Sequence, residues 1–274
     1  MTSESCAWEP RLLAIDGLNI LRRCYEANPA ADSPEKAQAT ATTAYSSFCR
    51  AVEEHEPTHA IAAFDYGGHT WRHSLYPRYR EKRKPMPAEL RAIIPAFMKR
   101  LKQELGLAVV TVPNVEADDV IGTVVSRWLK NKAAPAIVIS TDKDLAVLIA
   151  EGASIRDHFK REWHDEAWVR NKFGVGPELL GDLLSLMGDS TDDIPGVDGV
   201  GLKTAAKFLL NYGSLEALLD DAQNIKGKVG EQLVAQADNA RLSKKLVALN
   251  REVQLGLTWN NLRYGQTMPL AQAA

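Results

Sequence analysis

The sequence predicts an α/β fold, in which a mostly parallel central sheet is flanked by helices and followed by a helical lobe. Up to about residue 165, short apolar runs alternate with amphipathic helical stretches, as in parallel strands joined by crossover helices. Beyond that point the pattern is mostly helical. Acidic residues follow the apolar runs, and in parallel sheets the carboxyl ends of the strands meet at the edge where ligands bind. With 274 residues, 45% of them hydrophobic, the chain can bury a substantial core.

The expected elements follow from the spacing of the apolar residues. Strands are expected near residues 12–16, 60–64, 108–112, 136–140 and 153–157. Helices are expected near residues 18–26, 35–55, 87–105, 117–131, 143–149 and 202–212. We expect an α/β core over residues 11–165, a helical lobe over 166–257 and a tail over 258–274, with residues 269–274 frayed.

Composition predicts a cytoplasmic protein. The three cysteines, Cys6, Cys24 and Cys49, are odd in number and have no paired spacing, which is typical of a reducing compartment. Residues 1–9 contain no apolar signal segment, and no apolar run approaches the length of a membrane span. We therefore expect no association with a membrane.

Nine carboxylates stand at the ends of apolar runs or at helix starts. They are Asp16, Asp65, Glu116, Asp118, Asp119, Asp142, Asp144, Asp189 and Asp192. An acidic residue in such a place is a good helix N-cap, which explains any one of them as well as a functional role does. Capping needs one acceptor per helix, however, whereas residues 116–119 supply three carboxylates. Like charges this close raise one another's pKa unless cations neutralise them, so the sequence predicts a metal site.

The ligand types indicate which metal. Carboxylates are hard oxygen donors and no histidine lies beside them, which favours Mg²⁺ or Mn²⁺ over zinc. The cysteines are too far apart in sequence for a zinc motif. Mg²⁺ needs few protein ligands per ion, so this many acids predicts two or more ions. Paired ions about 4 Å apart suit phosphodiester hydrolysis, which is the leading chemistry.

The distribution of charge points to nucleic acid. The net charge is only −2, but residues 71–102 contain ten Lys or Arg against two Glu. In the middle of this segment, cations alternate with Tyr76 and Tyr79, a mixture that suits a phosphate backbone with unstacked bases. A solvated helix face would explain a charge run alone. The basic segment lies between two strands that carry acidic residues, and this position favours binding of DNA.

Residues 194–205 form a second informative segment. Gly199 and Gly201 allow a tight turn whose amides, at the start of a helix, could receive a phosphate. Leu202 separates Gly201 from Lys203, so the segment is not a Walker A loop, and it lacks the strand and third glycine of a dinucleotide site. A helix-hairpin-helix that grips a DNA backbone explains the glycines better, with a plain helix-helix turn as the alternative.

Six segments resemble, in order, motifs of the bacterial and phage 5′-nuclease family, which includes flap endonucleases, the 5′-nuclease domain of DNA polymerase I and the stand-alone exonuclease IX type. They are residues 16–19, 64–65, 79–83, 116–119, 140–145 and 188–197. The resemblance covers about residues 11–257, and no polymerase domain follows. It implies a PIN-like core with a basic helical arch over about 71–102, a helix-hairpin-helix lobe and a stand-alone 5′ nuclease.

The resemblance also implies roles for individual residues. Ligands of a first, catalytic ion are expected to be Asp16, Asp65, Glu116 and Asp118. Ligands of a second ion are expected to be Asp119, Asp142, Asp144, Asp189 and Asp192. Catalytic residues on the active-site side of the arch are expected to be Tyr79, Arg80 and Arg83. DNA contacts are expected from Arg23, Arg72, Arg78, Lys82, Lys84, Gly199, Gly201 and Lys203.

Three positions differ among relatives. Arg80 stands where relatives commonly have lysine, and it keeps the charge but not the compact ammonium geometry. Some exonuclease IX proteins lack the acids equivalent to Asp189 and Asp192, whereas this chain has both. The resemblance further implies a K⁺ ion at the hairpin, branched or 5′-flap DNA as substrate, and a DNA polymerase and ligase acting in trans. It also implies a monomer that associates with the nucleoid when on DNA.

Two other functions would explain part of the pattern. A PIN-like ribonuclease would account for the acids but would not need the basic insertion or the hairpin. A catalytically inactive, structure-specific DNA-binding protein would account for those two features but not for nine acids.

Overall fold

A computed structural model describes residues 9–265; the expectations for the N-terminal segment up to residue 8 and for frayed residues 269–274 lie outside this range. The sheet has six strands in the order β3-β2-β1-β4-β5-β6, with β1 to β5 parallel and β6 antiparallel. The strands are β1 (Leu12–Asp16), β2 (His59–Ala63), β3 (Ala108–Val110), β4 (Ala136–Ile139), β5 (Ser154–Asp157) and β6 (Glu162–His164). The strand order reverses between β1 and β4, where doubly wound sheets bind ligands.

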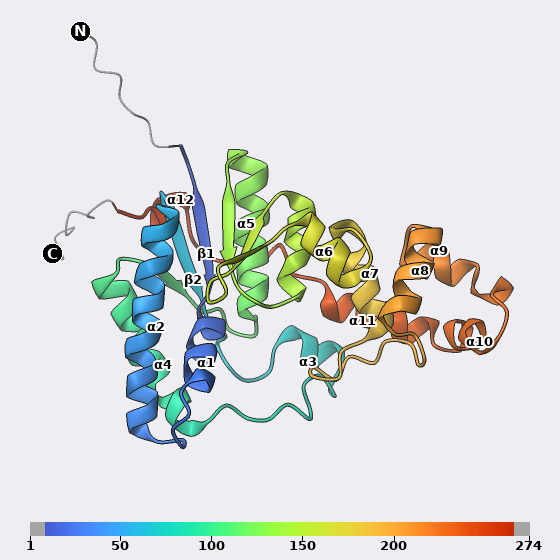
Figure 1. The fold of residues 1–274 in the computed structure, drawn as a ribbon, viewed down its shortest axis with the longest axis horizontal. Coiled ribbons are helices and arrows are strands. Elements are labelled where there is room, and N and C mark those ends of the chain that lie inside the picture. Colours follow the sequence, from blue (N-terminus) through green and yellow to red (C-terminus); the bar gives the residue numbers. More distant parts are fainter. Residues whose placement is uncertain (1–8, 266–274) are drawn as a thin grey trace, which may run out of the picture.

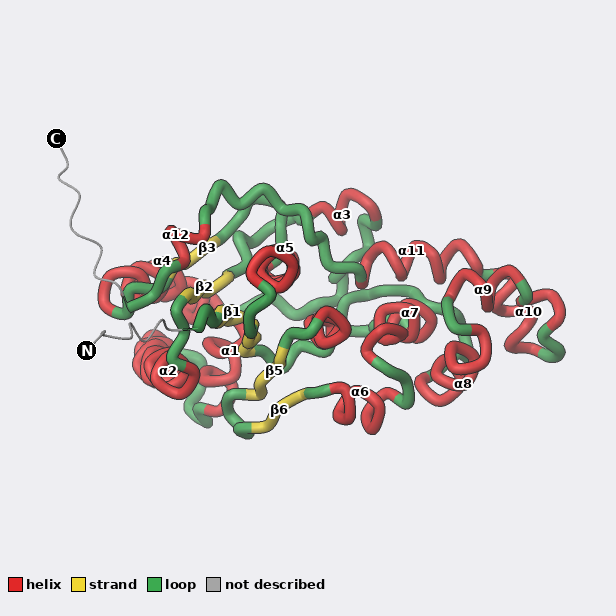
Figure 2. Tube along the Cα trace, turned by 90° about the horizontal axis from the view of Figure 1, so that it is seen from above, coloured by secondary structure: helices red, strands yellow, loops and turns green. Residues whose placement is uncertain are grey.

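Helices cover both faces of the sheet (Figures 1 and 2). Along β1, Leu13 and Ile15 face one layer, whereas Leu12 and Ala14 face the other. The first layer contains α1 (Gly17–Ala27), α2 (Pro34–His55) and α4 (Ala88–Glu104). The second contains α5 (Ala117–Lys132) and the 3-10 helix η1 (Asp144–Glu151). Burial on both faces explains why the strands appear in the sequence as continuous apolar runs.

A helical lobe extends from the sheet, at the right of Figure 1. Its helices are α6 (Glu166–Phe173), α7 (Pro177–Met187), α8 (Leu202–Tyr212), α9 (Leu215–Asp220), η2 (Ala222–Asn224), α10 (Lys228–Ala235) and α11 (Ala237–Val247). The lobe has its own apolar core, which includes Leu180 and Leu209. The chain then returns to the sheet, where α12 (Trp259–Leu262) places Trp259 against Trp128. As far as residue 265, the segment expected to be a tail packs on the α/β core.

All five predicted strands and the six predicted helical segments are present, with ends that differ by up to two residues. The segment 143–149 is a 3-10 helix, and β6 was not predicted. The basic arch is not one continuous helix: α3 (Trp71–Leu75) ends before Pro77, and α4 begins after Pro87. Between them the backbone forms turns and extended segments. Pro77 and Pro85 explain this interruption, because proline lacks an amide donor and disfavours helix in the residue before it.

None of the helices within residues 9–265 combines the length and apolar character that a transmembrane span needs.

Candidate active site at the carboxyl edge of the sheet

Four acidic side chains from separate elements face one another at the carboxyl edge of the sheet. Asp16 ends β1, Asp65 follows β2, Asp142 follows β4 and Asp118 lies in the first turn of α5. Burial, together with the charges of Asp142 and Asp65, raises the pKa of Asp16 to about 7. Burial also raises the pKa of Asp118 well above its usual range, with added repulsion from Asp142, Asp16 and Asp65. The predicted convergence of these acids is therefore present in the fold.

Hydrogen bonds orient two of these carboxylates. Asp16 accepts from the backbone amide of Asn19 at 3.0 Å and from the Ser140 hydroxyl at 2.9 Å. Asp65 accepts from the backbone amide of Ala117 at 2.8 Å, at the start of α5. Asp16 is thus an N-cap as well as a member of the acidic cluster, so the capping explanation is correct for this residue but does not account for its acidic neighbours.

A second group of acids adjoins Asp142. The pKa of Asp144 is raised to about 7, mainly by burial and then by the charges of Asp142, Asp189 and Asp192, while Lys143 opposes the shift. The Asp144 Oδ1 atom is buried and has no hydrogen-bond partner within residues 9–265. Lys143 forms an ion pair with Asp189. Asp142 therefore lies between the two groups, which together form one continuous acidic site.

The root of the arch, here residues 70–80, packs against Glu116, the N-cap residue of α5. Glu116 is 3% exposed and accepts from the Thr70 hydroxyl at 2.9 Å and the Tyr79 hydroxyl at 3.2 Å. The Arg80 guanidinium lies 3.0 Å from the same carboxylate. Burial raises the pKa of Tyr79 far above its usual range, with Glu116 as the next cause, so this phenol stays protonated and acts as a donor.

The arch also contacts the acids of the second group. Arg80 Nη2 lies 2.9 Å from Asp192 Oδ2, and Arg83 Nη1 lies 3.8 Å from Asp192 Oδ1. Arg80 adopts φ +56°, and its amide donates to the Asp192 carbonyl at 3.0 Å. Tyr79 completes this contact, with its hydroxyl 3.3 Å from Asp192. The three residues that we expected on the active-site side of the arch thus all lie against the acidic site.

The acidic site has the donor chemistry that divalent cations require. It offers clustered hard oxygen donors, with raised pKa values at Asp16, Asp118 and Asp144 and an unpartnered buried oxygen on Asp144. In the part of the chain that the structure describes, no three acidic, histidine or cysteine side chains form a ready coordination shell. Basic side chains of the arch and Lys143 hold some of the acids instead. A cation held by Glu116, Asp189 or Asp192 would have to replace these basic partners.

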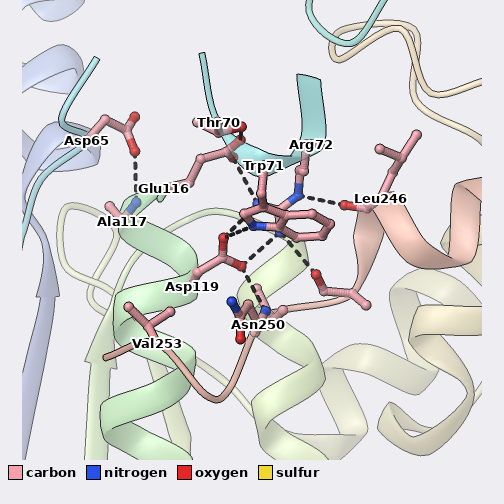
Figure 3. Close-up of polar contacts among 12 residues, drawn as sticks. Asp65, Thr70, Trp71, Arg72, Glu116, Ala117, Asp119, Leu246, Asn250 and Val253 are labelled. Carbon is pink, nitrogen blue, oxygen red and sulfur yellow. Dashed lines mark hydrogen bonds and ion pairs between the residues drawn. The ribbon is translucent and has the colours of Figure 1, made fainter. Parts of the chain in front are cut away.

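The Asp119 side chain is held by Arg72, Trp71 and Asn250 (Figure 3), and these contacts do not support its predicted role as a metal ligand. Its side chain is fully buried, and both oxygens are used. Arg72 donates to the two oxygens at 2.8 and 2.9 Å, and Trp71 Nε1 donates at 2.8 Å. The backbone amide of Asn250 supplies a further donor at 2.8 Å. With these four donors, the carboxylate is already neutralised and saturated.

The prediction that Arg72 contacts DNA is wrong, because this residue is buried. Arg72 is 3% exposed, and besides its ion pair with Asp119 it donates to the carbonyl oxygens of Leu246 at 2.7 Å and Ala248 at 3.0 Å. Its guanidinium therefore lies inside the protein, out of reach of a phosphate backbone.

The other residues predicted to contact DNA lie at the surface. Arg78, Lys82 and Lys84 are exposed on the interrupted part of the arch. The Lys82 amide donates to Asp193 at 2.8 Å, and the Lys82 side chain remains 77% exposed. Arg23, on α1, pairs with Asp157 at 3.1 Å and keeps 30% of its side chain exposed.

The hairpin of residues 194–201 lies on the lobe and leads into α8. Val197 and Val200 are buried and anchor it, whereas Gly199, Gly201 and Lys203 are exposed. A side chain at either glycine would meet nothing within 4 Å, so open space lies outside this turn. The hairpin is thus free to approach a large ligand closely.

Two features of the site were missed in the sequence. Lys143 stands between Asp142 and Asp144. A cation within an acidic motif was a signal that could have identified it. The contact of Thr70 with Glu116 had no such signal, because the two residues are 46 positions apart.

Comparisons with known proteins cover most of the chain. Residues 11–174 match the model of the 5′-3′ exonuclease N-terminal resolvase-like domain, and residues 175–269 match that of the 5′-3′ exonuclease C-terminal SAM fold. The flap endonuclease Xni of Aeromonas salmonicida is 38% identical over 258 residues, which cover 93% of this chain and 97% of the relative. The Xni protein of Psychromonas ingrahamii is 33% identical, covering 92% and 97%.

Solved structures show the same fold. A bacteriophage T5 5′-exonuclease mutant has a TM-score of 0.70 at 21% identity, covering 88% of this chain and 89% of that one. The catalytic core of Rad2 in complex with a DNA substrate has a TM-score of 0.58 at 15% identity, covering 95% and 83%. Since the two family models together span residues 11–269, the chain belongs to the 5′-3′ exonuclease family.

Proposed function

We propose that this protein is a structure-specific 5′ nuclease that hydrolyses DNA phosphodiesters at 5′ flaps and 5′ ends with the help of two divalent ions, Mg²⁺ or Mn²⁺. The observation that carries the proposal is the contact between the root of a basic arch and a buried acidic site. Relatives named flap endonuclease Xni support the choice of substrate.

The ions would be held by two overlapping groups of acids. The first ion is assigned to Asp16, Asp65, Glu116 and Asp118. The second ion is assigned to Asp142, Asp144, Asp189 and Asp192. Bound ions of this kind activate the attacking water and stabilise the charge on the leaving oxygen.

Arg80 and Arg83 supply the positive charge that the protein itself brings to the reaction. Both lie against Asp192, with Arg80 also on Glu116. With these acids holding cations, the two guanidinium groups would be available to hold the phosphate that is cleaved and to stabilise its transition state. Tyr79 stays in place as a donor because its buried phenol remains protonated.

The remaining surfaces position the DNA. The exposed cations Arg78, Lys82 and Lys84 guide the single-stranded 5′ arm, and the hairpin with Lys203 holds the duplex backbone. A domain boundary near residue 165, a K⁺ ion at the hairpin, a DNA polymerase and ligase acting in trans, a monomeric state and a cytoplasmic, nucleoid-associated location stay predictions.

One assay separates the three candidate functions. A labelled 5′-flap DNA, an RNA of matching structure and a blunt DNA duplex are incubated with the protein and Mg²⁺, with Asp142→Asn as the control. The proposal predicts cleavage of the flap DNA that depends on Mg²⁺ and is lost in the control. Preferential cleavage of the RNA would indicate a PIN-like ribonuclease. Binding of flap DNA without cleavage would indicate an inactive structure-specific protein.

A further inference from the structure

A buried network joins three segments that are distant in sequence. Arg72 lies in α3, at the root of the arch; Asp119 lies in α5; and residues 246–253, here called the strap, lead from α11 back to the α/β core (Figure 3). Arg72 and Asp119 form a two-point ion pair at 2.8 and 2.9 Å. Neither residue is more than 3% exposed.

The strap is fixed by the same pair. Its Leu246 and Ala248 carbonyl oxygens accept from Arg72, and its Asn250 amide donates to Asp119. One turn further along α5, the Thr123 hydroxyl donates to the Asn250 carbonyl at 2.9 Å and accepts from the Val253 amide. The strap therefore has two anchors on α5, of which only one includes the arch.

The network also reaches the acidic site. Arg72 Nη1 lies 3.6 Å from Glu116 Oε2, the carboxylate that Tyr79 and Arg80 also contact. Asp119 holds Arg72 in this position through both of its oxygens. A change at Asp119 would therefore be transmitted to Glu116 through the guanidinium.

We propose that Arg72 and Asp119 are positioning residues that fix Glu116 and the root of the arch against the strap. This proposal rests on the proposed function, since the group being positioned is an acid of the nuclease site. It assigns Asp119 to the packing of the site and not to its metal ligands.

The first test is a double-mutant cycle on stability and rate. Arg72→Met and Asp119→Asn each leave a buried partner unpaired and should each lower the melting temperature by roughly 10 °C. The double variant leaves no lone charge and should regain at least half of the loss. Its saturated single-turnover rate, measured below the melting range, should nevertheless stay about tenfold below the wild type, because Glu116 has lost its contact with Arg72.

Thr123→Val is the matched control, because it breaks the second anchor of the strap without contacting the arch. It should lower the melting temperature by a few degrees and leave the saturated rate within about twofold of the wild type. A rate that recovers together with stability in the double variant, or a Thr123→Val rate as low as that of Arg72→Met, would overturn the positioning role.

A binding measurement tests the assignment independently of cleavage. Titration of Asp119→Asn with Mn²⁺, with free Mn²⁺ followed by electron paramagnetic resonance, should give the same number of bound ions as the wild type. Loss of one ion would make Asp119 a ligand and refute the proposal. If the wild type cleaved no DNA, the proposed function would fail, whereas the stability cycle and the ion count would still decide whether Asp119 acts through Arg72.

Discussion

Substitution of the hairpin glycines tests whether this turn holds duplex DNA by close approach of the backbones. Gly199 has φ +77°, and Gly201 has φ −89° at the N-cap of α8; an added methyl group would contact nothing at either position. Alanine should therefore fit both sites without a clash. A DNA backbone bound on the turn would clash with the new methyl group. In the free protein the methyl group would contact nothing.

The structure allows the cost to the fold to be separated from the cost to binding. Alanine at Gly199 costs about 1 kcal/mol for its left-handed conformation, and at Gly201 it costs about as much through loss of a favourable N-cap. Gly213, the C-cap of α8, has φ +78° and equally open space, so Gly213→Ala is a control with a matched strain. All three variants should lose roughly 2–4 °C in melting temperature.

Binding should distinguish them. In an anisotropy titration of a labelled duplex without divalent ions, Gly199→Ala and Gly201→Ala should raise the dissociation constant roughly tenfold or more, equivalent to about 1.4 kcal/mol. Gly213→Ala should bind like the wild type, and single-stranded DNA should be affected less. If both hairpin variants bound duplex as well as Gly213→Ala does, the hairpin would be only a connection between helices.

Three further predictions concern the acidic site and the arch. Arg80→Ala should slow saturated single-turnover cleavage by about 100-fold, whereas Lys82→Ala should mainly weaken binding and lower the salt slope by about one; equal, small effects on cleavage would reduce the arch to an electrostatic funnel. Asp142→Asn should slow cleavage by orders of magnitude while flap binding persists, and unchanged turnover in Mg²⁺ would defeat the two-ion assignment. Asp16 and Asp144, with pKa values of about 7, bind more protons when folded than unfolded, so metal-free protein should lose stability as pH rises from about 4 to 7. The melting-temperature gain from Mg²⁺ over EDTA should therefore be larger at about pH 8 than at about pH 5, and a gain independent of pH would contradict this.

The parts of the fold that could be predicted are those where local pattern and burial agree. The parallel strands are buried on both faces, so each appears as an apolar run. The β6 strand could not be identified in this way, because Glu162 and Trp163 are exposed and the strand forms through backbone pairing with β5. The interrupted arch could have been predicted from Pro77 and Pro85, whose effect on helices is local.

The site was predictable as a group of acids but not residue by residue. Asp118 and Asp119 are neighbours in one motif, yet successive helical residues point about 100° apart, so one faces the acidic site and the other the interior. The environment of Asp119 depends on Arg72 and on Asn250, which is 131 positions away from Asp119. Sequence spacing contains no information about partners so distant.

The most direct test of the central claim is the number of divalent ions that the acidic site binds. Metal-free protein is titrated with Mn²⁺, and free Mn²⁺ is measured by electron paramagnetic resonance. The wild type should bind two ions per chain, and Asp189→Asn, which alters only the second group, should retain the first. Fewer than two ions bound by the wild type under conditions that support DNA cleavage would contradict the account.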